Sequence, residues 1–456
     1  MKHEFTMEEL EQYYDRSAQK IDTDSYYSPE LFSKYNVKRG LRNEDGTGVV
    51  VGLTEIGDVQ SYDMIDGKKV PKEGRLIYRG VDVYDLVDAC IREDRFGFEE
   101  CAYLLLFGEL PNKAQLCEFT DVLSHHRTLP EGFVRDMIMK APSQNIMNKL
   151  ARSVLVAYSY DPNPEDISVR NLFRQSIELI ASIPLMAAYA YQAKSHYHLG
   201  NSLFIHRPRP ELSTAENILC LSRPDCRFTH LEASTLDICM ILHAEHGGGN
   251  NSTFTSHVVA STGTDIYSSV AAALGSLKGP KHGGANLKVM EMMDEIKREV
   301  KHWDNDSEVR DYLVKIFNKQ AYDRTGLIYG LGHAVYTLSD PRCVLLKKKA
   351  SQLAKDKGRN EEYQLYESVE RLGPAVFNEL KNSNKPMCAN VDFYSGFVYD
   401  MLNIPVDLYT PLFAIARAVG FCAHIIEENI NGGRIIRPAY KNVRDRMEYV
   451  PLDQRK

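Results

Sequence analysis

A long succession of helix-patterned segments joined by short loops constrains the fold of this chain more than any other feature. From residue 98 almost to the C-terminus, apolar residues recur at the three- and four-residue spacing of amphipathic helices. Strand-like segments gather in one region, at 49–51 and 76–78, with the hairpin-turn pair Asp66-Gly67 between them. The pattern predicts a mainly α fold: a large multi-helix domain, a smaller inserted helical domain, and a small β-sheet near the N-terminus.

The domain boundaries follow from a change in composition along the chain. The segment 283–387 is more charged and less apolar than its flanks. We therefore expect residues 1–282 to form the first part of the large domain, with an N-terminal extension and the sheet, residues 283–387 the small domain, and residues 388–456 the C-terminal part of the large domain. Clefts between domains commonly bind small ligands. Expected helices lie at 7–21, 98–107, 113–127, 132–140, 146–158, 167–196, 228–245, 287–300, 308–319, 341–357, 361–381, 393–402 and 411–429, with a buried helix pair within 258–277. Pro184 should kink the helix 167–196 or divide it in two.

Composition and charge narrow the class of protein. Hydrophobic residues make up 43% and charged residues 26% of the 456 residues, which is ordinary globular composition with enough chain for a sizeable core. The formal net charge of -7 argues against a broad nucleic-acid surface. The acidic N-terminus lacks the apolar region of a signal peptide, and the longest apolar stretches are short or interrupted by Arg417 and His424. No membrane span is therefore expected.

The cysteines point to the compartment. There are nine, an odd number, and they include no C-x-x-C pair. This usage favours reduced thiols over a disulfide framework or a zinc ribbon. We expect a cytoplasmic protein.

A turn rich in glycine and proline sets one histidine directly ahead of a helical segment. The turn reads KGPKHGGAN, with His282 followed by Gly283 and Gly284. Glycine permits close approach of backbone or ligand, and the positive end of the helix dipole disfavours a charged imidazole. His282 therefore suits the role of a neutral hydrogen-bond donor, although a histidine that only caps the turn would give the same local pattern.

Two further histidine stretches could carry chemistry. His243 and His246 lie three residues apart and would share a helix face, so a metal pair has to be considered, but H-E-x-x-H is absent and no other ligand stands at a telling spacing. His243 alone fits a core histidine, and the glycines after His246 fit a helix end that opens on a pocket. In the second stretch, GLGHAVYTLSDPR, glycines precede His333, and Arg342 follows nine residues later at the start of the next helix.

Charged residues within apolar segments complete the candidate set. Asp392 in NVDFYSG is either a desolvated base with a raised pKa or a helix N-cap. Arg417 has apolar neighbours all round its helix, and a buried guanidinium requires an anion. Arg437 in RIIRP repeats the theme.

Taken together, these stretches resemble the citrate synthase family. The runs HGGGNNSTFTSHVVASTGTDIYS, KGPKHGGAN, GLGHAVYTLSDPR, NVDFYSG and PLFAIARAVG through RIIRP occur in the family's order and approximate spacing. EGRLIYRG and FEECAYLLLFGELP also look like family segments, whereas residues before about 49 add nothing to the likeness.

The resemblance implies a role for each matching residue. His282, His333 and Asp392 match the catalytic triad. The positions that bind oxaloacetate are matched by His246, His333, Arg342, Arg417 and Arg437, and in the family the last arginine comes from the neighbouring subunit of a homodimer. Coenzyme A contacts are matched by Lys385, Leu331, Gly332, Ala334 and Val335. Thr337, however, stands where many relatives carry a basic residue that contacts CoA phosphate. No metal and no cofactor are implied, since acetyl-CoA is a substrate.

The implied reaction condenses acetyl-CoA with oxaloacetate and water to give citrate and CoA. Desolvation makes Asp392 a stronger base, a neutral His282 stabilises the enol or enolate, and His333 with His246 polarises the ketone of oxaloacetate. We expect oxaloacetate to bind first and to close the small domain. The alternatives are a 2-methylcitrate synthase that uses propionyl-CoA, a non-catalytic regulatory relative, and a metal hydrolase that uses His243 and His246.

Overall fold

The computed structural model describes residues 6–43, 46–66, 68–333, 335–384 and 386–455, with backbone only for residues 24 and 25. The chain forms two compact units, Met1–Gly52 with Arg437–Lys456, and Leu53–Ile436. Of the predicted site residues, only Arg437 belongs to the first unit. The second unit therefore contains the candidate site.

The first unit consists of short helices and extended chain. Its helices are α1 (Met7–Ser25), α2 (Glu30–Lys34) and the 3-10 turns η1 (Arg39–Leu41) and η5 (Leu452–Gln454). Helix α1 begins with a capping box between Thr6 and Glu9, which fixes its first turn, and it covers the expected helix 7–21. Among the described residues of this unit, none is buried.

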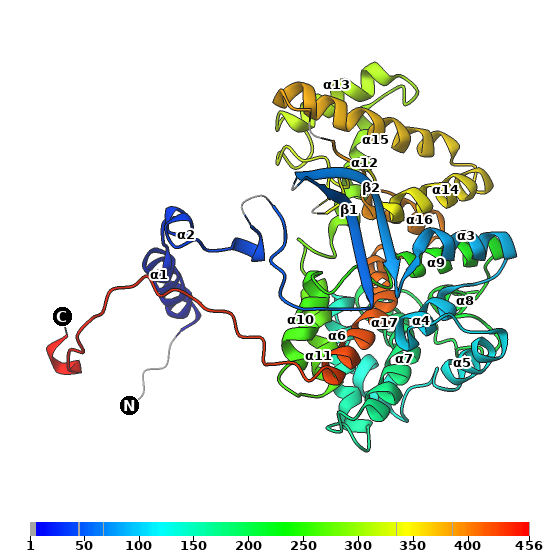
Figure 1. Ribbon diagram of the computed structural model, residues 1–456, viewed down its shortest axis with the longest axis horizontal. Coiled ribbons are helices and arrows are strands. Elements are labelled where there is room, and N and C mark those ends of the chain that lie inside the picture. The colour runs from blue at the N-terminus through cyan, green and yellow to red at the C-terminus, as the bar shows by residue number, and fades with distance from the viewer. Residues whose placement is uncertain (1–5, 44–45, 67, 334, 385, 456) are drawn as a thin grey trace. The chain divides into compact units, whose positions relative to one another are not determined.

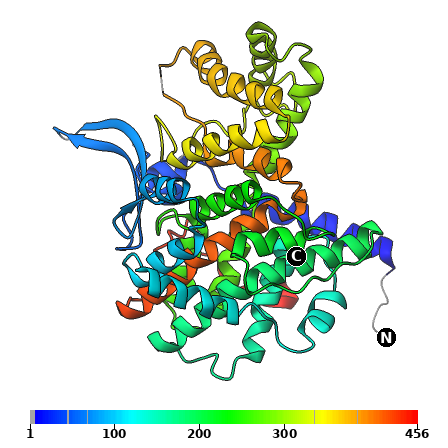
Figure 2. The same ribbon diagram turned by 90° about the vertical axis from the view of Figure 1, so that its right-hand side faces the viewer.

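A three-stranded antiparallel sheet begins the second unit. Its strands are β1 (Gly57–Ile65), β2 (Lys68–Tyr78) and β3 (Val81–Asp82), in the order β1-β2-β3. Ile65 pairs with Lys68 across the predicted turn, where Asp66 has a left-handed φ of 50° and Gly67 lies outside the described residues. Figure 2 shows this hairpin extending away from the helices. The strand prediction at 49–51 was wrong: these residues pair with no strand among the described residues, and Val50 is exposed.

One group of helices forms the larger part of the second unit. Helix α17 (Tyr409–Ile430) packs against α7, α9, α10 and α11 and is almost entirely buried. With its preceding turn, α17 is long and apolar enough to cross a membrane, but 94% of its most apolar window is buried inside the protein, as in the core helix of a globular fold. The other members are α3 (Val83–Glu93), α4 (Phe98–Phe107), α5 (Lys113–His125), α6 (Ile146–Ala157), α7 (Val169–Leu199), α8 (Thr214–Ser222), α9 (His230–His243), α10 (Asn251–Ala260) and α11 (Ile266–Leu277), with the short turns η2 (Val134–Met139), η3 (Tyr158–Tyr160) and η4 (Val406–Leu408).

Two details of this group test the helix predictions. Pro184 lies inside α7, which continues through it, so the expectation of a divided helix was wrong. Pro184 and its neighbours Ile183 and Leu185 are all buried in the core. The expected buried pair within 258–277 is α10 and α11, which pack against each other, although α10 begins earlier, at Asn251.

A second group of helices lies together at one end of the second unit, as Figure 1 shows. Its members are α12 (Ala285–Glu299), α13 (Asp306–Phe317), α14 (Pro341–Asp356), α15 (Asn360–Lys381) and α16 (Val391–Met401). Helix α16 packs against α12 and α14, and α14 also packs against α9 of the larger group. The segment 283–387 contains α12 to α15, and its boundaries as a separate domain stay a prediction. The mainly α class with a small N-terminal sheet is confirmed.

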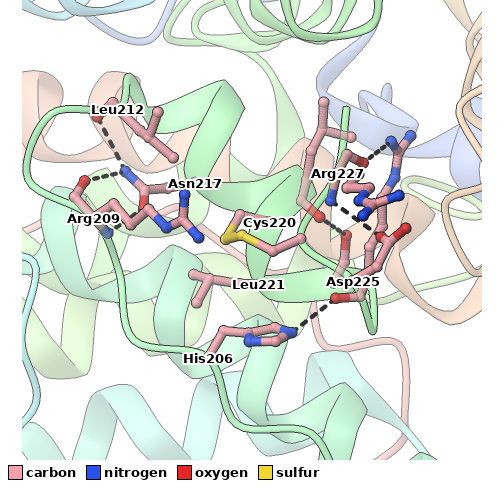
Figure 3. Close-up of a disulfide and its surroundings, with 12 residues drawn as sticks. His206, Arg209, Leu212, Asn217, Cys220, Leu221, Asp225 and Arg227 are labelled. Atoms are coloured by element: carbon pink, nitrogen blue, oxygen red, sulfur yellow. Dashed lines mark hydrogen bonds between the residues drawn. A yellow bond between two sulfur atoms is a disulfide. The ribbon is translucent and has the colours of Figure 1, made fainter. Parts of the chain in front are cut away.

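The expectation of reduced cysteines was wrong for one pair. Cys220 at the end of α8 and Cys226 in the following loop form a disulfide, while seven cysteines are free. The chain turns back between them and brings their Cα atoms within 3.9 Å, a proximity that no spacing rule for C-x-x-C pairs would detect. Figure 3 shows the hydrogen bonds around this loop, including those from Asn217 to the carbonyl groups of Arg209 and Leu212.

Candidate functional site

The predicted histidine turn joins α11 to α12, and its glycines are required by contact. A Cβ on Gly283 would lie 2.2 Å from the carbonyl oxygen of Leu277 and 2.9 Å from Cγ2 of Thr410, so only glycine fits there. The Thr410 hydroxyl donates to the Gly283 carbonyl at 2.9 Å and ties this turn to the start of α17. His282 directly precedes Gly283 in this anchored turn, and its ring is half-buried.

His282 faces a serine and is held neutral. Its Nε2 lies 3.0 Å from Oγ of Ser252, and Ser252 Oγ also lies 2.9 Å from Oδ1 of Asn250. Burial, followed by the charge of Arg417, lowers the pKa of His282 to about 4. The imidazole is therefore uncharged near neutral pH, as the sequence predicted, with burial as the principal cause and Arg417 next.

His333 lies in the loop between α13 and α14, and its tautomer is set by backbone. Its Nδ1 accepts hydrogen bonds from the N–H groups of Val335 and Tyr336, both at 3.0 Å. A ring nitrogen that accepts cannot carry the proton, so Nε2 of the neutral ring is the donor. Nε2 lies 3.4 Å from Nη2 of Arg342, which is also a donor. Two donors that face each other at this distance suit an oxygen acceptor of a ligand.

His246 lies at the centre of the site, in the segment that follows α9. Its ring centroid is 5.4 Å from that of His333, and its side chain is 8% exposed. The pKa of His246 lies well below its ordinary value. Burial is the principal cause, and the charges of Arg342, His333, Arg417 and His282 add to it. One neutral ring therefore lies within the electrostatic reach of four other predicted site residues. Among the described residues, its Nε2 has no hydrogen-bond partner.

Arg342 is fixed by the residue that caps its own helix. The N-cap Asp340 accepts from the backbone N–H and from Nε of Arg342 at 3.0 Å each, and from its Nη2 at 2.7 Å. The second carboxylate oxygen of Asp340 also accepts from the N–H of Val391 at 3.3 Å, so the same carboxylate joins the starts of α14 and α16. Sequence reasoning missed this role, although Asp directly before Pro-Arg at a helix start is a capping signal.

Arg417 is fully buried in α17 with much of its hydrogen-bonding capacity unused. Its Nε donates to the His243 carbonyl at 2.7 Å, and its guanidinium lies 4.8 Å from the centroid of the Phe413 ring. Neither terminal nitrogen has a hydrogen-bond partner among the described residues. Burial lowers the pKa of Arg417 to about 10, against the opposing charge of Glu245. A buried cation with unpaired donors requires an anionic ligand.

Asp392 lies in the first turn of α16, and the alternative that it caps the helix was wrong. The cap is Asn390, whose side chain accepts from the Asp392 N–H at 3.0 Å. Burial raises the pKa of Asp392 to about 6, with Arg342 opposing and Asp340 adding to the shift. A carboxylate of this pKa is mostly ionised near neutral pH and is a stronger base than an exposed aspartate.

The sheet supports the loop that carries His333. A Cβ on Gly74 of β2 would lie 2.2 Å from the Ser339 carbonyl oxygen and 2.6 Å from the Tyr336 ring. Tyr78, also of β2, donates from its hydroxyl toward the carbonyl groups of Ile241 and Glu245. Strand β2 thus contacts the loop that carries His333 and the segment that carries His246, a role that the sequence did not reveal.

The predicted coenzyme A residues are placed only in part. Leu331 pairs with Ala389 in an isolated bridge, Gly332 donates its N–H to the Cys388 carbonyl at 2.7 Å, and Val335 donates to His333. Ala334 and Lys385 lie outside the described residues. The contacts of all five residues with coenzyme A stay predictions.

Two further predictions concern residues that the structure treats separately. Arg437 is exposed within the first compact unit, and its role stays a prediction. His243 is 1% exposed, its Nε2 lies 3.0 Å from the Tyr399 hydroxyl, and its ring packs on Phe413, as expected for a core histidine. Within the part of the chain that the structure describes, no group of three or more His, Cys, Asp or Glu residues could hold a metal ion.

Comparison with known proteins identifies the family. A family model described as citrate synthase, C-terminal domain, matches residues 43–439. A citrate synthase from Haloferax volcanii is 33% identical over 427 residues, covering 92% of this chain and 99% of the relative. The 2-methylcitrate synthase 1 of Corynebacterium glutamicum is 34% identical over 406 residues, covering 88% of this chain and 97% of the relative.

A solved structure supports the same conclusion. The ternary complex of carboxymethyl coenzyme A and oxaloacetate with citrate synthase from the archaeon Thermoplasma acidophilum matches with a TM-score of 0.74 at 25% identity, covering 92% of this chain and 99% of that chain. The fold and the matched length define an enzyme of the acyl-transferring class. The chain belongs to the citrate synthase family.

Proposed function

We propose that this protein condenses acetyl-CoA with oxaloacetate and water to give citrate and CoA. The observation that carries the proposal is the buried guanidinium of Arg417, whose unpaired terminal nitrogens lie within electrostatic reach of neutral His246 and of Arg342. Two guanidinium groups and neutral imidazole donors suit a small dicarboxylate that carries a ketone. Oxaloacetate is such a molecule.

Asp392 is the base in this mechanism. The methyl group of an acetyl thioester is a far weaker acid than any carboxylic acid, so its proton leaves only if the developing oxyanion is stabilised. Neutral His282 supplies the stabilising N–H. The Ser252 hydroxyl has one proton and can donate a hydrogen bond either to Nε2 of His282 or to Oδ1 of Asn250. When it donates to His282, the ring proton lies on Nδ1, and Nδ1–H donates a hydrogen bond to the thioester oxygen.

The remaining hydrogen-bond donors of the site bind and polarise oxaloacetate. Arg342 and Arg417 bind the two carboxylates, while Nε2–H of His333, with His246, polarises the ketone and protonates it as the enol carbon attacks. Hydrolysis of the citryl thioester then releases CoA and citrate. No step needs a metal or a resident cofactor.

Thiol release tests the proposal directly. Purified protein should release CoA thiol from acetyl-CoA only when oxaloacetate is present, with no effect of a chelator, and Asp392→Asn should reduce the rate at least about 100-fold. The nearest alternative is 2-methylcitrate synthesis, the activity named for the Corynebacterium relative. A higher kcat/KM with propionyl-CoA than with acetyl-CoA would favour it, and one methylene is worth only about 1–3 kcal/mol in an apolar pocket. Absence of any acyl-CoA turnover would favour a non-catalytic relative.

The assembly proposed here is a homodimer in which Arg437 completes the neighbouring subunit's site. In support, the first compact unit has no buried residue among those described, while Tyr440, Met447 and Tyr449 expose large apolar side chains. A mixed dimer of Arg437→Met and Asp392→Asn chains tests this. If Arg437 acts across the interface, one site of the mixed dimer has both residues intact and regains activity. If it acts within its own chain, the mixed dimer stays inactive.

The proposed location is the cytoplasm. Seven of the nine cysteines are free, six of them buried, which supports it against the single disulfide Cys220–Cys226. Cell fractionation with an antibody against the protein is the measurement, and recovery in an exported fraction would contradict the assignment.

A further inference from the structure

A buried chain of titratable groups leads to Arg417 and is not used by the mechanism above. His424 lies seven residues after Arg417 in α17 and is fully buried. Its Nε2 lies 3.1 Å from Oε1 of Glu245, and its Nδ1 lies 3.1 Å from Nε2 of His257 in α10. His257 in turn faces Oε2 of Glu428 from its Nδ1 at 2.8 Å. The order along the chain of contacts is carboxylate, imidazole, imidazole, carboxylate.

The number of protons in this arrangement follows from the donors that it needs. Nδ1 of His257 needs a proton to donate to Glu428, and the contact between the two rings needs another. Nε2 of His424 lies within ion-pair distance of Glu245 without an aligned hydrogen bond, and a positive charge there needs a third proton. The total is one more proton than two neutral rings carry. The pair therefore holds a single shared positive charge between the carboxylates of Glu245 and Glu428.

The electrostatics favour a single positive charge on the pair rather than two. Burial, followed by the charge of His424, lowers the pKa of His257, against the attraction of Glu428. A second proton on the pair is thus disfavoured. Burial alone would raise the pKa of Glu245, but His424 and then Arg417 hold it below its ordinary value.

Glu245 connects the histidine pair to the substrate site. A Cβ on Gly420 would lie 2.5 Å from Oε2 of Glu245 and 3.4 Å from Cδ of Arg417, so carboxylate and guanidinium stem meet across this glycine. Oε1 of Glu245 also accepts from the N–H of Gly247. Oε2 has no hydrogen-bond partner among the described residues, and neither do the terminal nitrogens of Arg417.

We propose that His424 and His257 share one proton that neutralises Glu245, and that this neutralisation leaves the charge of Arg417 available to the substrate carboxylate. Glu245, His424 and His257 are positioning residues that act through Arg417. The inference rests on the binding of oxaloacetate at Arg417 proposed above. When the pair loses its proton, the negative charge of Glu245 competes with the carboxylate of the substrate.

The other charged groups around the pair come from α17 and from the segment after α9. Glu427 and Glu428 face it from α17, with Oε2 of Glu427 3.7 Å from Nδ1 of His424. Oε1 of Glu427 is already occupied by the backbone N–H of Glu55, at 2.8 Å, in the segment before β1. Glu245, in the segment after α9, is the group that also lies beside Arg417. Of these three carboxylates, Glu245 is therefore the one whose charge acts on Arg417 when the shared proton is lost.

The test begins with His424→Gln, which keeps hydrogen-bonding capacity but not the charge. The KM for oxaloacetate should rise about tenfold, which is the change in an equilibrium constant that corresponds to one pKa unit. The kcat should change less than about twofold. His302→Gln is the matched control, because His302 pairs with Glu308 at 2.6 Å on the surface. This control should leave both constants unchanged.

A second substitution separates charge balance from simple structural damage. Adding Glu245→Gln removes the carboxylate that needed neutralising and preserves the acceptor for Gly247. The double variant should regain a KM within about threefold of the wild type. An unchanged KM in His424→Gln, or a double variant no better than the single one, would overturn the inference.

The pH dependence keeps the inference testable if His424→Gln fails to fold. Between about pH 5.5 and about pH 9, the KM of the wild type for oxaloacetate should rise through a single ionisation as the pair loses its proton, while Glu245→Gln should stay flat. The same rise in both proteins, or no rise in the wild type, overturns it. Absence of any thiol release by the wild type would instead refute the proposed function, so the two failures are distinguishable.

Discussion

Replacement of Arg417 by methionine should stabilise the free protein and abolish tight binding of oxaloacetate. The guanidinium is fully buried, has no ion-pair partner within 4.0 Å among the described residues, and leaves both terminal nitrogens unpaired. Burial of such a charge costs several kcal/mol, and the hydrogen bond from Nε to the His243 carbonyl returns only about 1.5–3 kcal/mol. Methionine fills a similar volume without the charge, so the free energy of unfolding should rise by about 1–3 kcal/mol.

The ligand should stabilise the wild type more than the variant. Oxaloacetate at about 100 times its Kd should stabilise the wild type by about 2.7 kcal/mol. Loss of a buried charged partner costs about 2–5 kcal/mol of binding, so Arg417→Met should bind at least about 30-fold more weakly. Without ligand, the variant should therefore unfold at the higher temperature. At the same oxaloacetate concentration, the wild type should gain about 2.7 kcal/mol and the variant less than about 1 kcal/mol.

Thermal unfolding with and without oxaloacetate, together with thiol release, measures both effects. Arg174→Met is the control, because Arg174 in α7 pairs with Asp161 at 2.6 Å and with Glu178 at 2.9 Å. That variant should lose stability without a change in KM. If Arg417→Met unfolds at a lower temperature than the wild type without ligand, or gains as much stability from oxaloacetate as the wild type does, the reasoning about an unpaired guanidinium is refuted.

Further predictions concern the base, the anchor of the acceptor site, the histidine turn and closure. The kcat should fall as pH falls through about 6, where Asp392 takes up its proton, and a pH profile with no such limb would contradict the raised pKa. Asp340→Asn should raise the KM for oxaloacetate about tenfold or more, since it weakens a charge-assisted pair, and titration calorimetry should give the same loss. Gly283→Ala, whose Cβ would meet the Leu277 carbonyl, should lower kcat at least about tenfold, and an unchanged kcat would mean that the turn can shift freely. Oxaloacetate alone should change the fluorescence of Trp303 and the tryptic digestion pattern, and identical spectra and digests would argue against ligand-induced closure.

Local signals in the sequence were sufficient where neighbours along the chain decide the structure. The helix expected at 98–107 has those bounds in the structure, because Gly97 precedes it and Gly108 ends it in a left-handed conformation. The hairpin at Asp66 likewise follows from local turn chemistry. Val49–Val51 failed because β-branched composition alone provides no partner strand.

The parts of the site that escaped prediction depend on contacts between distant segments. Asp340 contacts Val391 across 51 positions, and His424 reaches Glu245 across the fold from another helix. Composition marks such residues as polar within apolar surroundings, but it does not indicate which of them meet. The sequence identified candidate residues by type and surroundings, whereas their tautomers, partners and pKa directions required coordinates.

The double attachment of Asp340 ties two halves of the chemistry together. The Asp340 carboxylate accepts a hydrogen bond from the guanidinium of Arg342 and another from the first backbone N–H of the helix that carries Asp392. A different keto-acid substrate that shifts Arg342 would therefore also displace the start of the helix that carries Asp392. Variants selected for a different keto acid should lose deprotonation rate at the same time, so altered acceptor choice in this enzyme will require compensating changes at the start of both helices.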